Sequence, residues 1–303
     1  MSTDTRTQAA PPLPFDRRSE DVGNIVELGH LNLRVPDQSL AIQFYVSGLG
    51  LTRDPYLMTG IDNAWINVGA SQFHLPIGAA QVLGGTVHLV MADLDALVER
   101  LTRLRSRLAG TRFAFERGAD GVDVQCPWGN RIRVHAPDVA RFGRVQLGLA
   151  SIEIDVPAGS TPGIGRFYRD VLAAPVSRPE DGSIRIAIGL EQSLVFRESR
   201  ETSRALRPYD GHHIQISVAD FSGVHGRLLE RGLVTEESSR SQYRFEHIVD
   251  PDSGEVLATL EHEVRSMRHP LYARPLVNRN LDSTTSRFAA GDESAAWRLP
   301  SAP

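Results

Sequence analysis

Four histidines stand at polar positions in short segments in which polar and apolar residues alternate. They are His30, His74, His88 and His135. Successive side chains of a strand point to opposite faces, so each histidine lies opposite its apolar neighbours. Neutral imidazole is a good ligand for zinc, iron, manganese or nickel, and a vacant position on such a metal can take two adjacent oxygens of a substrate. The alternative for each histidine taken alone is a hydrogen-bonded side chain without a ligand role.

The segments that carry these histidines belong to four similar units, each with a strand, a helix and further strands. The opening strands lie near residues 24–35, 85–91, 151–157 and 213–220. The helix of the first unit contains Phe44-Tyr45, and the helix of the third contains Phe167-Tyr168. Asp37 is expected to cap the first helix, and Asp93 or Asp95 the second. An internal repeat of this kind decides the fold before any single motif does.

Length and composition indicate a globular protein of two domains. The chain has 303 residues, is 41% hydrophobic and carries a formal net charge of −4, so nothing favours binding to nucleic acid. All 33 basic residues are arginine, which excludes Schiff-base lysine chemistry. A single cysteine excludes a thiolate cluster, and no apolar run is long enough for a membrane span. We therefore expect a cytoplasmic location, and the sequence leaves open whether the chain forms homo-oligomers.

The four units and their Gly-containing closing turns resemble the vicinal oxygen chelate superfamily, which includes glyoxalase I, extradiol dioxygenases and bleomycin resistance proteins. The resemblance implies an α+β fold in which four βαβββ units pair into two half-open barrels. The expected organisation is a disordered N-terminal arm over residues 1–22, a first barrel over 23–140, a second barrel over 145–264, and a partly disordered extension over 265–303.

In this family a divalent metal lies inside a barrel, on side chains of the first and last strands. The resemblance thus implies that His30, His88 and either His74 or His135 hold the metal in the first barrel. The family's usual glutamate, four residues after the turn glycine, is replaced by Arg133 when counted from Gly129. A guanidinium repels a cation but suits an anionic substrate, so Arg133 and His135 are the catalytic candidates.

The second barrel matches the family less well. Ser151 stands where the first histidine is expected, and His213 matches the second. The carboxylate position falls on Ala258, so Glu261 reaches the cavity only if a bulge changes the strand's parity. His213 and Glu261 form the alternative site, and a barrel without a metal is the simpler interpretation of this half.

The resemblance implies a metal-assisted enzyme acting on a small oxygenated substrate, of the dioxygenase type or the glyoxalase-like lyase and isomerase type. The cofactor is expected to be a divalent ion, namely Fe, Mn, Zn or Ni. The rival hypothesis is a metal-free protein of the same fold that binds a small molecule. Metal content separates the two.

Overall fold

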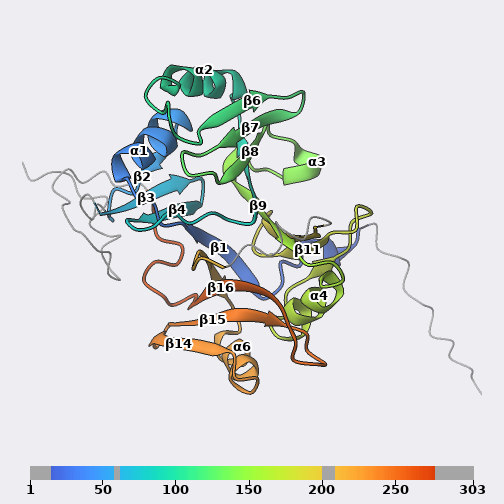
Figure 1. Ribbon diagram of the computed structural model, residues 1–303. Coiled ribbons are helices and arrows are strands. Elements are labelled where there is room, and N and C mark those ends of the chain that lie inside the picture. The colour runs from blue at the N-terminus through green and yellow to red at the C-terminus, as the bar shows by residue number, and fades with distance from the viewer. Residues whose placement is uncertain (1–14, 58–61, 200–208, 277–303) are drawn as a thin grey trace, which may run out of the picture.

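One strand, one helix and further strands repeat four times along the chain, as the sequence predicts (Figure 1). The computed structural model describes residues 15–57, 62–199 and 209–276. Their strands form two eight-stranded mixed sheets, and the helices lie on the sheets' outer sides. This arrangement confirms the α+β class with four βαβββ units.

The first two units occupy the N-terminal half of the chain. The first contains β1 (Ile25–Asn32), α1 (Gln38–Ile42), the π-helical turn η2 (Gln43–Gly48), β2 (Thr52–Arg53), β3 (Asn63–Val68) and β4 (Ser71–Pro76). The second contains β5 (Gly85–Met91), α2 (Leu94–Leu104), β6 (Ala114–Arg117), β7 (Gly121–Gln125) and β8 (Arg131–His135). A short helix, α3 (Val139–Phe142), leads to the third unit.

The last two units have the same order of elements. The third contains β9 (Leu147–Val156), α4 (Thr161–Asp170), β10 (Val176–Ser177), β11 (Ile184–Ala187) and β12 (Ser193–Glu198). The fourth contains β13 (His213–Val218), α6 (Phe221–Leu229), β14 (Val234–Ser239), β15 (Gln242–Val249) and β16 (Val256–Ser266).

The first unit pairs with the fourth, and the second with the third. In one sheet β1 runs antiparallel to β13, and in the other β5 runs antiparallel to β9. The expected pairing of consecutive units, over residues 23–140 and 145–264, is therefore wrong. Alternation along a strand fixes which face is buried, but it says nothing about which distant strand lies alongside. We call the sheet of units one and four the β1/β13 sheet, and the other the β5/β9 sheet.

Local sequence signals place the helices. Asp37 accepts a hydrogen bond from the Leu40 N–H at 3.0 Å, and Asp93 accepts one from Ala96 at 2.8 Å, so both act as N-caps. Helix α2 then turns Leu97 and Leu101 onto the sheet, where neither is exposed. Burying each leucine contributes about 2 kcal/mol.

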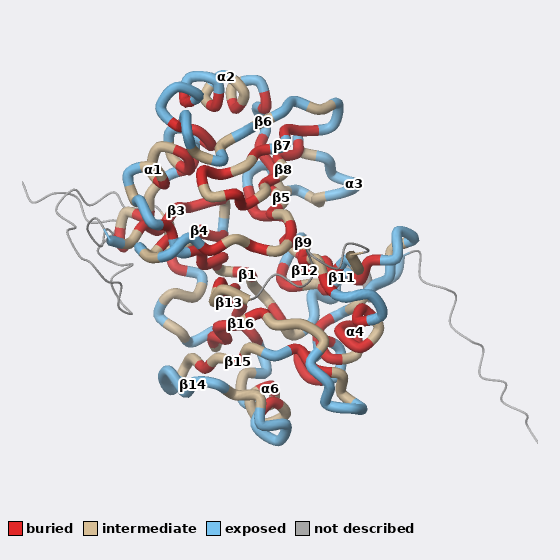
Figure 2. Tube along the Cα trace, in the orientation of Figure 1, coloured by how far each residue is buried: buried red, intermediate tan, exposed pale blue. Residues whose placement is uncertain are grey.

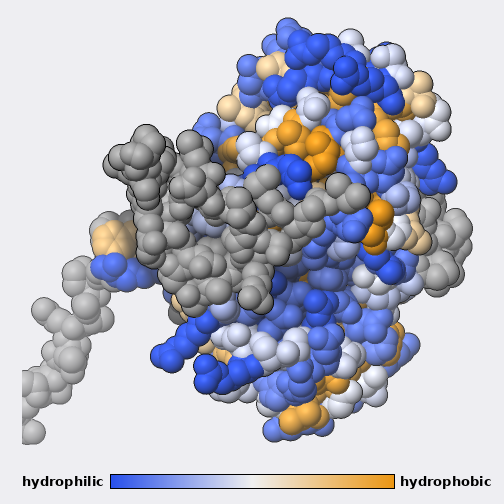
Figure 3. Space-filling view, turned by 90° about the vertical axis from the view of Figure 1, so that its left-hand side faces the viewer, coloured by the Kyte–Doolittle hydropathy of each residue, from blue (hydrophilic) through white to orange (hydrophobic). Residues whose placement is uncertain are grey.

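The core follows the outer faces of the strands. Figure 2 shows buried residues along the strands and on the inner sides of the helices. The repeated Phe-Tyr pairs, Phe44-Tyr45 and Phe167-Tyr168, are at most 1% exposed. On the face in Figure 3 hydrophilic residues predominate, and apolar residues gather in small separate groups. The inner faces of the sheets are left to polar side chains.

The two ends of the chain are described in part. Within the expected N-terminal arm, residues 17–20 form a 3-10 turn, while residues 1–14 lie outside the described range. Residues 267–276 turn back from β16 toward the β1/β13 sheet, and residues 277–303 lie outside the described range. No helix among the described residues is long and apolar enough to cross a membrane.

Candidate metal centre

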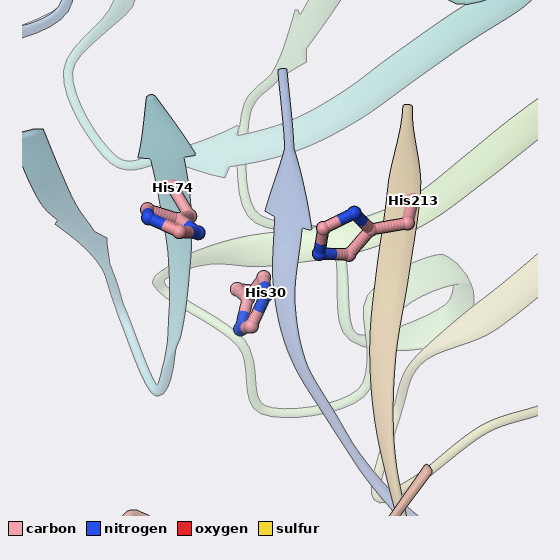
Figure 4. Close-up of side chains that lie close together, drawn as sticks. All are labelled: His30, His74 and His213. Atoms are coloured by element: carbon pink, nitrogen blue, oxygen red, sulfur yellow. The ribbon is translucent and has the colours of Figure 1, made fainter. Parts of the chain in front are cut away.

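Three histidines converge on the inner face of the β1/β13 sheet. His30 lies on β1, His74 on β4 and His213 on β13, so the first and fourth units both contribute (Figure 4). One ring nitrogen from each lies within 4.8 Å of the other two. The ring centroid of His30 is 5.5 Å from that of His74 and 5.7 Å from that of His213.

The strand register explains this convergence. Asn32 of β1 pairs with His74 on one side and with His213 on the other. These two histidines therefore flank β1 at the same level, and His30 stands two residues earlier on the same face. Gly29, next to His30 in the chain, makes room for the Gln215 side chain. A Cβ atom on residue 29 would lie 1.9 Å from the side-chain oxygen of Gln215.

The three imidazoles lack the hydrogen bonds that buried nitrogens normally make. Four of their ring nitrogens are buried and make no hydrogen bond among the described residues, namely His30 Nε2, His213 Nε2 and both nitrogens of His74. The Nε2 of His213 has only a longer contact, 3.7 Å, to Glu263 Oε2. Leaving such a group unsatisfied costs about 1–3 kcal/mol. A ligand that contacts these four nitrogens would therefore remove an unfavourable contribution to the stability of the folded protein.

The environment keeps all three rings neutral. Burial, followed by the charge of Arg265, lowers the pKa of His30 well below its usual value. The same causes lower the pKa of His74 to about 3. Burial and then Arg244 lower the pKa of His213 to about 2. Because neutral imidazole is the form that binds metals, the rings are ready as ligands at neutral pH.

The histidines are packed against a tryptophan and a group of carboxylates and guanidinium groups. The indole of Trp65 on β3 stacks on His74, with centroids 3.8 Å apart and planes 13° apart. Glu261 on β16 lies with its Oε1 3.3 Å from Nδ1 of His213 and also pairs with Arg244. Glu263 pairs with Arg244 and, at 2.6 Å, with Arg265. The two carboxylates offset the two guanidinium charges beside the histidines.

The donor set fits a divalent metal. Three imidazole nitrogens and a nearby carboxylate are a typical ligand set for iron, manganese, zinc or nickel. His30, His74 and His213 would hold the ion, since one ring nitrogen of each lies within 4.8 Å of the other two. Glu261, which pairs with Arg244, would lie beside it on the side of His213.

A cavity of about 520 Å³ opens beside His30, and the C-terminal residues form one wall of it. Arg265, Arg274 and Leu276 lie in its lining with Gln72 and His30. Arg274 forms a buried ion pair with Asp54 and donates to the Gln72 side-chain oxygen at 3.3 Å. The backbone oxygen of Leu276 accepts a hydrogen bond from Asn67 at 3.2 Å.

The remaining predicted residues lie in the other sheet. His88 Nδ1 is 2.9 Å from His135 Nε2. Neither of these two histidines belongs to the cluster that His30 forms. The expected set of His30, His74 and His88 is therefore not brought together, because His88 belongs to the β5/β9 sheet. Arg133 forms a 2.5 Å ion pair with Asp123.

The expected alternative pair does come together. His213 and Glu261 face each other across the β13–β16 ladder, where they are register partners. The β15–β16 pairing contains two register shifts, which is the kind of irregularity that changes a strand's parity. Of this pair, His213 belongs to the cluster with His30 and His74, and Glu261 lies beside His213.

Sequence reasoning missed three residues that shape the centre, namely Trp65, Arg265 and Arg274. Trp65 lies between the apolar residues Ala64 and Ile66 of one strand. Because successive side chains point to opposite faces, this alternation alone places Trp65 on the inner face. No sequence signal indicates that Arg274, after the last strand, returns to Asp54.

Comparisons with known proteins bear on the fold. No protein-family model matches the chain, and no curated protein matches it. Glyoxalase I from Zea mays aligns with a TM-score of 0.51 at 15% identity, over 80% of this chain and 92% of that one. A variant of that maize enzyme gives 0.50 at 16% identity, over 82% and 95%. A Bacillus subtilis protein provisionally named a dioxygenase gives 0.50 at 13% identity, over 81% and 86%.

At these identities the likeness concerns the fold. It agrees with the four repeated units, the two mixed sheets and the polar inner faces described above. The chain therefore shares the fold of maize glyoxalase I and of the Bacillus subtilis protein, which agrees with the architecture expected from the sequence.

Proposed function

We propose that this protein is a metal-dependent enzyme whose divalent ion is held by His30, His74 and His213. The observation that carries the proposal is the cluster of three neutral imidazoles, two buried and that of His74 half-buried, with ring nitrogens that make no hydrogen bond. Glu261 is the candidate fourth ligand because it lies beside His213. A bound divalent ion would act as a Lewis acid on oxygens of the substrate.

The protein's own residues suit a small substrate that carries an acidic oxygen. Arg265 and Arg274 line the cavity next to His30, and both are largely buried. A guanidinium in a buried site forms strong, directional hydrogen bonds to a carboxylate or an enolate oxygen. Each has an acidic partner already, so substrate binding here competes with Glu263 and Asp54.

The reaction types that we propose are dioxygenation and glyoxalase-like lyase or isomerase chemistry. The support is the shared fold with maize glyoxalase I and with the Bacillus subtilis protein provisionally named a dioxygenase. Both reaction types need two adjacent substrate oxygens on one metal, which three protein nitrogens leave room for.

The test is the metal content of the purified full chain, measured by inductively coupled plasma mass spectrometry. We expect close to one divalent ion per chain in the wild type and loss of that ion in His30→Ala, His74→Ala and His213→Ala. The matched control is His88→Ala, which removes a histidine at the corresponding place in the β5/β9 sheet and should leave the metal content unchanged.

Two results would contradict this assignment. Loss of metal in His88→Ala, with retention in His213→Ala, would move the centre to the set expected from sequence. A wild type that takes up no Fe, Mn, Zn or Ni after dialysis against each ion would favour the metal-free binding protein instead.

A further inference from the structure

The β5/β9 sheet carries a second cavity, of about 510 Å³, on its own inner face. Its floor holds His88 and His135 together with Ser151 and Ser193, and arginines of the third unit and of α3 stand around it. Ser151 and Ser193 are register partners on β9 and β12, as His213 and Glu261 are on β13 and β16. Each sheet therefore has a cavity on its inner face, and different side chains line the two cavities.

This lining lacks the donors that a cation needs. Beside the two histidines it offers Ser151, Ser193 and Val195. A hydroxyl and an apolar side chain do not replace an imidazole and two carboxylates as metal ligands. Within the described residues, the His88–His135 pair has no third histidine or carboxylate close enough to complete a cluster.

The lining holds three arginines and three acidic residues, and two of the acidic residues pair with the same arginine. Glu153 and Asp181 in the lining both pair with Arg197, at 3.0 and 3.2 Å. Arg185 donates to the Ser193 hydroxyl at 2.7 Å, and neither it nor Arg141 forms an ion pair with a carboxylate in the described part of the chain. The third acidic residue of the lining, Glu191, is exposed.

The pKa values of His88 and His135 are both lowered. Burial, followed by the charges of Arg133, Arg185, Arg141 and Arg197, lowers the pKa of His88 to about 4. Burial and then the neighbouring His88 lower the pKa of His135 to about 4. Both rings are therefore neutral at pH 7; guanidinium charges contribute to both shifts, and at His135 the charge of Asp123 opposes them.

One buried nitrogen in this cavity lacks a partner. His135 is 4% exposed, and its Nδ1 makes no hydrogen bond among the described residues. When His135 Nε2 accepts the hydrogen bond from His88 Nδ1, the single proton of neutral His135 lies on Nδ1. That orientation presents an unpaired N–H donor, which suits an anionic oxygen.

We propose that this second cavity binds a small oxyanion, a carboxylate or a phosphate, between Arg185, Arg141 and His135. Arg185 and Arg141 supply the charge, Ser193 and the Nδ1–H of His135 supply neutral donors, and the metal centre in the other sheet takes no part. The anion anchor expected at Arg133 thus belongs to other residues, because Asp123 already pairs with that guanidinium.

The test is isothermal titration calorimetry of the full chain with inorganic phosphate and, separately, with malonate, at constant ionic strength. We expect at least one of them to bind with one-to-one stoichiometry, and the two arms show whether phosphate or carboxylate is preferred. Arg185→Gln and Arg141→Gln should each weaken binding about tenfold or more. Arg117→Gln, which removes an exposed arginine paired with Asp95 outside the cavity, is the matched control and should not change Kd.

Each remaining outcome would overturn the proposal. The first is that neither anion binds at about 10 mM. The second is that Arg185→Gln and Arg141→Gln bind the anion with the same affinity as the wild type. The third is that His30→Ala abolishes binding while Arg185→Gln does not. The last result would place the anion at the metal centre. Thermal midpoints of all variants, measured in parallel, identify any loss of binding that comes from unfolding.

Discussion

His74 offers a sharp test of the candidate metal centre, because its replacement by phenylalanine should act in opposite directions with and without metal. Phenylalanine keeps the ring that stacks on Trp65 and removes two buried nitrogens that have no partner. In metal-free protein at pH 7.5, His74→Phe should leave stability unchanged or raise it by roughly 1 kcal/mol. With added metal, the wild type should gain stability and the variant should not.

The pH dependence of the free energy of unfolding gives a second quantitative expectation for His74→Phe. The folded-state pKa of His74 is about 3, and that of an unfolded histidine is about 6.5. Between these values the unfolded chain binds a proton that the folded chain does not, so stability falls as the pH falls through this window. The loss is about 1.4 kcal/mol per pH unit for this one histidine, or roughly 2–3 kcal/mol from pH 6.5 to 4.5. His74→Phe should remove that contribution.

The assay is urea unfolding of chelator-treated protein at pH 7.5, 6.5, 5.5 and 4.5, with the free energy of unfolding from linear extrapolation. The control is His247→Phe, which changes an exposed histidine on β15. Equal pH slopes for the wild type and His74→Phe would refute the claim that His74 is held neutral by burial. A large loss of stability in metal-free His74→Phe at pH 7.5 would show that its nitrogens have partners after all.

Three further variants test contacts described above, each by urea unfolding. Arg274→Ala leaves the buried Asp54 carboxylate without its ion-pair partner and should cost about 3–5 kcal/mol; a cost below about 1 kcal/mol would show that the C-terminal residues are not docked. Tyr168→Phe removes the 2.7 Å hydrogen bond to His262 and should cost about 1–2 kcal/mol, and no change would mean that the bond is not formed. Leu101→Ala should cost about 2–5 kcal/mol, and tolerance of it would contradict the packing of α2 on the sheet.

The sequence predicted most of the local structure because the signals for it are local. The opening strand expected at 85–91 is found at those residues, and Asp37 and Asp93 cap the helices they precede. Alternation also placed His30 and His74 on an inner face correctly. Each of these inferences needs only side-chain direction within one element.

The sequence could not predict which histidines meet. His30 was expected beside His88 because the two lie in consecutive units, whereas β1 pairs with β13 and brings His213 instead. Nothing in a strand's own residues distinguishes these partners. Both candidate strands alternate in the same way, so the choice depends on how four units pack together.

The pairing of the first unit with the fourth has a consequence for synthesis and folding. Unit one emerges first from the ribosome, but β1 finds its antiparallel neighbour only when β13 has been made. Until then the β1/β13 sheet is unfinished, and contacts of such high sequence separation are slow to form. In that interval the unpaired side of β1 offers free backbone groups to the fourth unit of another copy. Exchange of unit four between two nascent chains would build the same histidine cluster across two polypeptides, so crowded expression should yield a dimer that retains the cluster.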